Sequence, residues 1–160
     1  MKQPDSARFR RLRSIRWHLR TRADVWLAAR MFAWRLVLPA LKRIVPIDRL
    51  APAMTRGRGP RPEEDSVVRL ASWIYGSRPL TGGDNCLERS LLVYRYLSQA
   101  NPETRLILGF RNGDRALEGH AWVAVGERSM GADTDELGAY APVMSFGPGG
   151  TILQRTRDGA

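Results

Sequence analysis

The sequence predicts an α+β fold in which helices come first and an antiparallel sheet follows. In the N-terminal half, apolar side chains recur at three- and four-residue steps, which is the period of a buried helical face. From residue 105 the pattern changes to short runs that are typical of strands, such as RLILGFR at 105–111 and GHAWVAV at 119–125. Gly126-Glu127 then suits a two-residue type II′ hairpin, with glycine where φ is positive. Helices followed by hairpin-connected strands form an α+β arrangement.

The individual elements have recognisable start and stop signals. Pro39 is expected to kink or end the first helix, and Pro46 ends the piece that follows it. Residues 55–62 (TRGRGPRP) have the composition of a linker, and Gly76 stops the next helix. The expected helices are 24–44, 63–75 and 85–100, and the expected strands are 105–111, 119–125, 128–133, 143–146 and 151–153.

The charge is concentrated in the first part of this chain of 160 residues. Residues 1–62 carry 16 Lys and Arg against 3 Asp and Glu, whereas residues 63–160 carry 10 against 13. Such asymmetry predicts an interaction segment joined to a nearly neutral domain. We therefore expect residues 1–62 to form a basic amphipathic helical arm with its linker, and residues 63–160 to form the domain that carries the chemistry.

Composition excludes several classes of protein. The chain is 43% hydrophobic and 26% charged, which allows a packed core. The single cysteine excludes an intrachain disulfide and fits a reducing, cytoplasmic compartment. With only two histidines beside it, a cysteine-rich zinc finger is excluded, and we expect neither a metal nor another cofactor. The first 22 residues are charged throughout, so a signal peptide is not expected, and arginines interrupt every apolar stretch long enough to span a membrane.

Cys86 is the first candidate for chemistry. It follows Asn85, a good N-cap residue, and Glu88 stands at the spacing of a capping box, so Cys86 is expected at the first position of a helix. Free amides and the positive end of the helix dipole stabilise a thiolate there and lower its pKa. The alternative is that Cys86 is a small buried hydrophobic residue. Arg89 and Arg95 on the same helix are interpreted as solvent-facing.

His120 is the second candidate, on a strand downstream of the cysteine helix. A histidine beside a thiol can take its proton and later give one to a leaving amine. If Gly126-Glu127 is the hairpin turn, the strand register places His120 opposite Asp133, which could orient the imidazole. Asp135 is the reserve candidate for this role. The alternatives are a hydrogen-bonded histidine on a sheet face and a solvated aspartate in a turn.

Three segments together support a family resemblance: CLERSLLVYRYL (86–97), LILGFR (106–111) and GHAWV (119–123). With this order of cysteine and histidine, the chain resembles the leader peptidases of lasso-peptide biosynthesis, the transglutaminase-like B-proteins, over roughly residues 64–150. The resemblance implies a papain/transglutaminase-like cysteine-protease core. It assigns Cys86 as the nucleophile and His120 as the general base and acid. An ungapped match puts the family's acidic position on Ala132, and the hairpin register leads us to nominate the adjacent Asp133.

The resemblance also implies a reaction and partners. The reaction is cleavage of a ribosomally made precursor peptide between leader and core, which frees the core amine for macrolactam formation by a separate ATP-dependent cyclase. The oxyanion is expected to be held by the Cys86 backbone amide, with Asn85 as a second group. A separate leader-recognition protein is an expected partner besides the precursor and the cyclase.

Two other functions remain as alternatives: a transglutaminase-like amidase or acyltransferase on another peptide, and a non-catalytic scaffold that presents the precursor to the cyclase. The basic arm likewise has three interpretations. It can pack on the domain as a solvated basic helix, bind a membrane surface, since Arg, Trp and Leu mix along it, or bind nucleic acid through its charge. We favour docking to partner proteins, to an acidic peptide or to the inner face of the membrane. Nucleic-acid binding is not expected, because no recognisable motif accompanies the charge.

Overall fold

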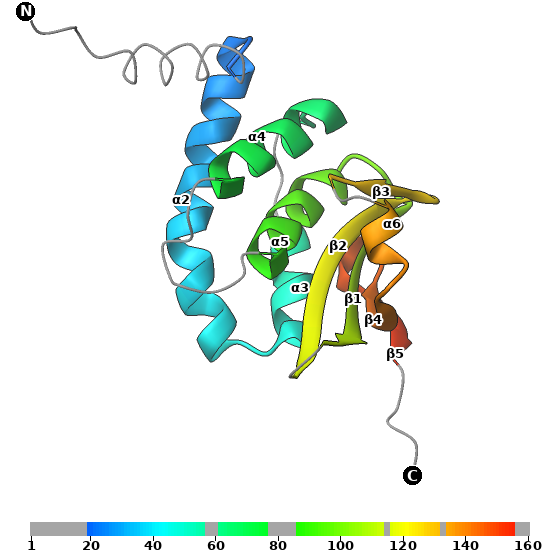
Figure 1. The fold of residues 1–160 in the computed structure, drawn as a ribbon. Coiled ribbons are helices and arrows are strands. Elements are labelled where there is room, and N and C mark those ends of the chain that lie inside the picture. Colours follow the sequence, from blue (N-terminus) through cyan, green and yellow to red (C-terminus); the bar gives the residue numbers. More distant parts are fainter. Residues whose placement is uncertain (1–18, 57–60, 77–85, 114–115, 132–133, 156–160) are drawn as a thin grey trace, which may run out of the picture.

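The computed structural model describes residues 19–56, 61–76, 86–113, 116–131 and 134–155, and it confirms the α+β arrangement (Figure 1). The helices are α2 (Arg22–Ile44), α3 (Ile47–Thr55), α4 (Glu64–Gly76), α5 (Cys86–Leu97), α6 (Thr134–Leu137) and the 3-10 turn η1 (Pro148–Gly150). The strands are β1 (Thr104–Asn112), β2 (Leu117–Val125), β3 (Arg128–Met130), β4 (Ala141–Phe146) and β5 (Ile152–Arg155).

The strands form one antiparallel sheet in the order β3-β2-β1-β4-β5. The predicted hairpin between β2 and β3 is confirmed, since Val125 pairs with Arg128 and Gly126 has a φ of +60°. Only a residue without a Cβ adopts that φ at no steric cost. The third strand is shorter than the predicted 128–133, because β3 ends at Met130 and residues 132–133 lie outside the described ranges.

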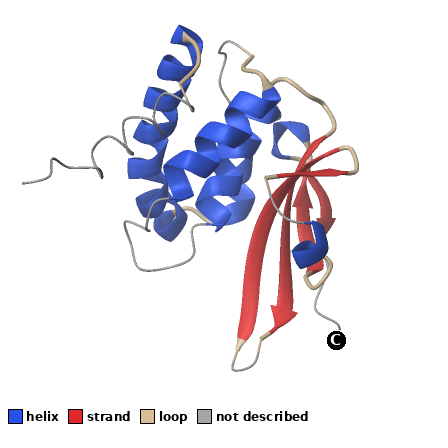
Figure 2. Ribbon diagram, turned by 45° about the horizontal axis from the view of Figure 1, so that its top comes forward, coloured by secondary structure: helices blue, strands red, loops and turns tan. Residues whose placement is uncertain are grey.

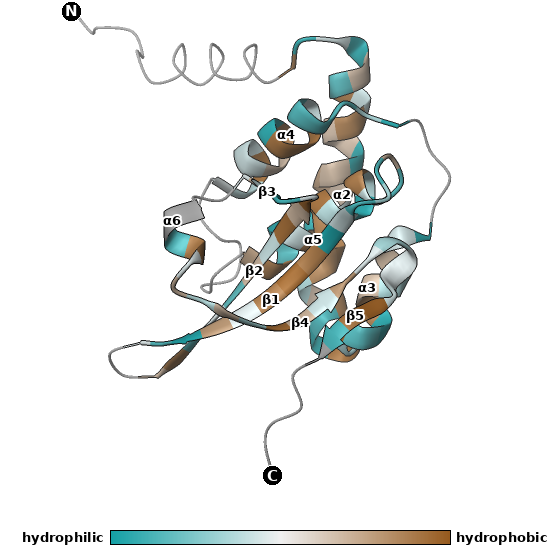
Figure 3. Ribbon diagram, turned by 90° about the vertical axis from the view of Figure 1, so that its right-hand side faces the viewer, coloured by the Kyte–Doolittle hydropathy of each residue, from teal (hydrophilic) through white to brown (hydrophobic). Residues whose placement is uncertain are grey.

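The larger helices cover one face of the sheet, and the short α6 lies on its other side (Figure 2). Leu106 of β1 and Val123 of β2 pair with each other and belong to the main hydrophobic cluster. Because side chains alternate along a strand, the side chains of His120 and Trp122 project from the face of β2 that is opposite to the face of Val123. The middle of β1 is strongly hydrophobic, as Figure 3 shows, which suits a strand that is covered by helices.

Pro39 does not end the first helix, since α2 continues through it to Ile44, and the expected kink at Pro39 stays a prediction. The lost main-chain hydrogen bond is offset by packing, because Leu38 is fully buried and Leu41 lies against the same cluster. Pro46 does end this helix, but it then serves as the N-cap of α3, a helix that the sequence pattern did not reveal.

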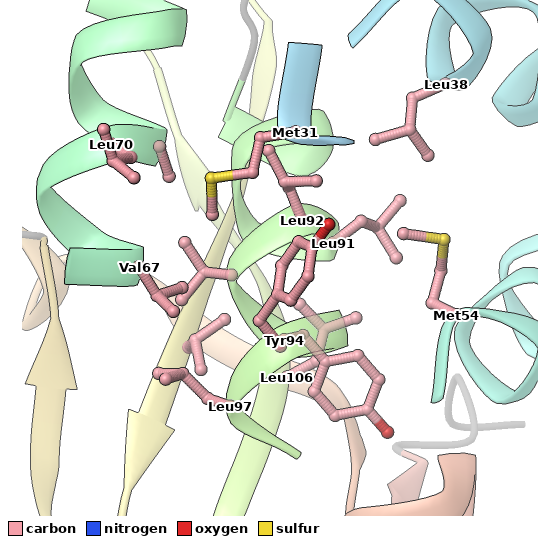
Figure 4. Packing of buried hydrophobic residues seen from close by; sticks show 14 of the residues in the cluster. Met31, Leu38, Met54, Val67, Leu70, Leu91, Leu92, Tyr94, Leu97 and Leu106 are labelled. Atoms are coloured by element: carbon pink, nitrogen blue, oxygen red, sulfur yellow. The ribbon is translucent and has the colours of Figure 1, made fainter. Parts of the chain in front are cut away.

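The core joins helices from both parts of the chain (Figure 4). Met31 of α2 and Met54 of α3 pack in one cluster with Leu70 of α4, Leu92 of α5 and Leu106 of β1. The described helices of residues 19–56 therefore share their core with the cysteine helix and the sheet, while the boundary at residue 62 stays a prediction. None of the helices in the described ranges has both the length and the apolar character that a membrane span requires.

Candidate active site

Cys86 is the first residue of α5 in the described chain, and its side chain is partly exposed. Asn85, the expected N-cap and second oxyanion group, lies outside the described residues. Glu88 is in the first turn of α5, where it is nearly fully buried and forms an ion pair of 2.7 Å with Lys42 of α2. This pair attaches the helix that carries Cys86 to the long N-terminal helix.

His120 lies in β2 directly opposite Gly109 of β1. Two aromatic rings flank its imidazole: the centroid of Tyr140 is 5.0 Å away at an interplanar angle of 31°, and that of Trp122 is 6.3 Å away at 23°. Tyr140 precedes β4 and was not singled out by the sequence, where an aromatic residue before a strand carries no specific signal. The ring plane of His120 is therefore constrained by neighbours from two segments.

Gly109 gives the Trp122 ring its room beside the histidine. A Cβ at Gly109 would lie 2.9 Å from an atom of the Trp122 ring and 2.9 Å from the carbonyl oxygen of Ala141. Contacts this short do not occur between real side chains and their neighbours, so position 109 accommodates only glycine without a shift of the strand or the ring. Gly109 is also the residue that pairs with His120 in the sheet, so the space for the Trp122 ring lies directly beside the histidine.

Arg111 continues the contacts with aromatic rings toward the end of the sheet where β1 ends and β2 begins. Its guanidinium carbon lies 4.7 Å from the centroid of the Tyr140 ring, and it forms a hydrogen bond and an ion pair, both at 2.7 Å, with Glu118. The hydrogen bond to Glu118 and the charge of that carboxylate raise the pKa of Arg111. Tyr140 thus lies between the imidazole and a permanently charged side chain.

Cys86 and His120 line the same groove, which has a volume of about 400 Å³. Its walls come from α3, α5, β1, β2 and β4, and they are almost entirely apolar apart from these two side chains. The remaining lining residues are Ile47, Leu87, Leu108, Gly109, Phe110, Gly119, Ala121, Val143 and Met144. The structure thus brings together, in one apolar groove, the two residues that the sequence nominated for chemistry.

A buried hydrogen bond connects the two elements that carry these residues. The hydroxyl of Ser90, one turn after Cys86, donates to the carbonyl oxygen of Ala121, which follows His120, over 2.8 Å. No pattern in the sequence singles out Ser90, since a serine in a helix usually faces solvent or its own backbone. Here it sets the position of α5 against β2.

The third member of the predicted triad is not decided by the described residues. β2 and β3 pair with the register on which the nomination of Asp133 rests, but Asp133 and the alternative position Ala132 both lie outside the described residues. The backbone of Asp135 belongs to α6. The choice between Asp133 and Asp135 stays a prediction.

A thiol and an imidazole at one apolar groove are suited to nucleophilic attack on a carbonyl carbon followed by proton transfer to the leaving group. Apolar walls limit the access of water and strengthen electrostatic interactions within such a groove. Within the described ranges, no three His, Cys, Asp or Glu side chains are grouped closely enough to hold a metal ion.

Comparison with protein families gives one match, to the transglutaminase-like superfamily, over residues 8–145. The match includes the helices of the basic arm as well as α5 and the sheet through β4. Comparisons with curated proteins and with solved structures give no match.

Proposed function

Because this chain belongs to the transglutaminase-like superfamily, we propose that it is a cysteine peptidase that removes the leader from a ribosomally made lasso precursor peptide. The superfamily includes both cysteine peptidases and acyltransferases, and its members generally depend on a cysteine. The observation that carries the proposal is that Cys86, at the start of α5, and His120, in β2, line one groove.

In the proposed reaction, the Cys86 sulfur attacks the carbonyl carbon of the peptide bond between leader and core. His120 takes the thiol proton and transfers it to the nitrogen of the core as the carbon–nitrogen bond breaks. Water then adds to the thioester, the carbon–sulfur bond breaks, and the leader leaves with a free carboxylate. The Cys86 amide, together with a group near Asn85, stabilises the oxyanion of both tetrahedral intermediates.

The third side chain of the proposed triad is Asp133, with Asp135 as the alternative. A carboxylate bound to one imidazole nitrogen fixes the tautomer in which the other nitrogen faces the thiol. Tyr140 and Trp122 restrict the ring from the sides and would assist that orientation.

The lining of the groove supports a substrate with apolar side chains at the cleavage site. The groove is lined by apolar side chains that carry no charge, among them Leu87, Leu108, Val143 and Met144. A charged side chain that entered the groove would therefore lose its hydration without compensation. The precursor would be delivered by a separate leader-recognition protein, and the freed core amine would pass to the cyclase. These partners follow from the resemblance to lasso leader peptidases.

The test is incubation of the full chain with a precursor peptide and its recognition protein, followed by mass spectrometry. We expect one cut that yields a leader with a free carboxylate, and we expect Cys86→Ala and His120→Ala to abolish it. His18→Ala is the matched control, because it removes the only other histidine, and it should leave the cut intact. Since Cys86 is the only cysteine, a single iodoacetamide adduct should block the reaction.

The same assay separates the alternatives by product mass. A leader joined to an added amine would assign acyl transfer instead of peptide hydrolysis. Loss of ammonia from a glutamine side chain would assign amidase activity. Macrolactam formation that persists with Cys86→Ala in the presence of the cyclase would indicate a scaffold and would overturn the peptidase proposal.

A further inference from the structure

The outward face of α2 is unusually apolar for a surface helix. Ten large hydrophobic side chains are exposed in the described part of the chain, and six of them belong to this one helix. Trp26 and Ile44 are the most exposed, at 74% and 78%. The six residues are Val25, Trp26, Phe32, Leu36, Val37 and Ile44.

These side chains lie on a single face that is opposite the packed one. Two adjacent lines run along the helix: one through Trp26, Val37 and Ile44, and one through Val25, Phe32 and Leu36. Met31 and Leu38, on the opposite side, are fully buried against the rest of the molecule. The helix is therefore apolar on both sides, although its outer side packs against no described element. Figure 1 shows α2 on the side of the molecule that is remote from the sheet. An apolar surface of this extent marks an interaction site.

The charges on this face are all positive. Arg22, Arg30 and Arg43 are exposed within the same arc as the apolar residues. The only acidic residue of α2 is Asp24, which is buried and bound to Arg69 and to the backbone at the start of the helix. The 21 residues that precede α2 add 7 Lys and Arg against a single aspartate.

Exposed apolar side chains together with exposed arginines favour a lipid bilayer over a second copy of the chain as the partner of this face. A second copy of the chain would bring arginines of one face against those of the other, with no carboxylate on α2 to neutralise them. A bilayer with anionic headgroups satisfies both features, since Trp, Phe and Leu enter the interface while the guanidinium groups reach the phosphates. A helix of 23 residues, lying flat, would present about 35 Å of such a surface.

We propose that the outward face of α2 binds the surface of an anionic phospholipid bilayer, with the helix parallel to the membrane plane. No residue that lines the groove of Cys86 and His120 belongs to α2, so this binding is independent of the proposed peptidase reaction. The two can therefore succeed or fail separately: peptide cleavage is measured without vesicles, and vesicle binding is measured without peptide.

The experiment is co-sedimentation of the full chain with vesicles of phosphatidylcholine alone or mixed equally with phosphatidylglycerol. We expect binding to the mixed vesicles and little binding to the neutral ones. Leu36→Glu should weaken binding to the mixed vesicles about tenfold or more, because it places a carboxylate in the centre of the face. The matched control is Leu117→Glu, which makes the same change at an equally exposed leucine of β2 (63% against 60% for Leu36) and should bind as the unchanged chain does.

Two outcomes would overturn the proposal. If Leu36→Glu and Leu117→Glu bind equally well, the attraction comes from the basic residues before α2 and not from this face. If the unchanged chain binds neither kind of vesicle, the face serves a protein partner instead of a membrane. Circular dichroism of both variants confirms that the fold is intact before the vesicle measurements are compared.

Discussion

The hydroxyl of Ser90 lies 2.8 Å from the carbonyl oxygen of Ala121, and this buried hydrogen bond joins the helix of Cys86 to the strand of His120. Ser90→Ala is expected to cost about 1 kcal/mol of unfolding free energy, since one buried hydrogen bond is lost. A larger effect is expected on kcat of peptide cleavage than on KM, because Ser90 holds α5, which carries the thiol, against β2, which carries the imidazole. The control is Ser129→Ala on β3. Equal kinetics for the two variants would contradict a positioning role for Ser90.

Gly109 is expected to tolerate no larger residue. Gly109→Ala places a methyl group against the Trp122 ring and the backbone of Ala141, and we expect a loss of about 1–3 kcal/mol in unfolding free energy together with reduced cleavage. Thermal unfolding and the cleavage assay measure the two effects. Gly76→Ala is the control, because a Cβ there meets nothing within 4 Å. A stable, fully active Gly109→Ala would show that Trp122 does not need this space.

The Tyr140 ring is expected to hold the His120 imidazole through ring contact and not through its hydroxyl. Tyr140→Phe keeps the ring and should leave kcat nearly unchanged, whereas Tyr140→Leu should lower it about three- to tenfold, as expected for a lost aromatic contact of ~0.5–1.5 kcal/mol. The pH profile of kcat should change with Leu and not with Phe. A strong loss with Phe would instead assign the role to the hydroxyl.

The ion pair of Lys42 and Glu88 is expected to stabilise the contact between α2 and α5. Lys42→Met leaves a carboxylate that is only 4% exposed without its cation, which should cost about 3 kcal/mol in denaturant unfolding. Adding Glu88→Gln should restore a large part of that loss, because the buried charge is removed. The same cycle on Arg128 and Glu64, whose arginine is 74% exposed, should show no measurable coupling.

The N-terminus of α2 is expected to stabilise the fold in a pH-dependent way. Burial alone would raise the pKa of Asp24, but hydrogen bonds from the backbone of Thr21 and Arg20, with Ser66 and Arg69, hold it below 3.8. A lowered pKa in the folded state stabilises the protein above the unfolded value, and this contribution is lost as the pH falls through the folded pKa.

Asp24→Asn tests this expectation. The substitution should cost about 0.5–2 kcal/mol at neutral pH, and the difference from the unchanged chain should shrink as the pH falls below about 4. Denaturant unfolding across that range measures it, with the exposed Glu127→Gln as the control. A difference that stays constant with pH would mean that the aspartate acts through its shape and not its charge.

Some features depended on contacts that no local pattern contains. Arg95 was interpreted as solvent-facing, yet it is only 8% exposed, lies 4.4 Å from the centroid of Trp34 and donates to the carbonyl of Met54 over 2.8 Å. Desolvation by burial lowers the pKa of its guanidinium. A helical wheel of α5 alone predicts that Arg95 faces solvent, because arginine is polar. The residues that cover it, Trp34 of α2 and Met54 of α3, are distant in the sequence and do not appear on that wheel.

Periodicity, turn chemistry and motif order are local properties of the chain. They were enough to predict helices followed by antiparallel strands, the hairpin at Gly126-Glu127 and the nomination of Cys86 and His120, but they did not reveal α3, α6 or η1. Long-range contacts were needed to show that α2 and α3 belong to the common core and that Ser90, Gly109 and Tyr140 pack around the residues of the groove. They were also needed to show that no described element covers the outward face of α2. Each of these depends on which surfaces meet after folding, and burial is settled by the summed packing of segments far apart in sequence.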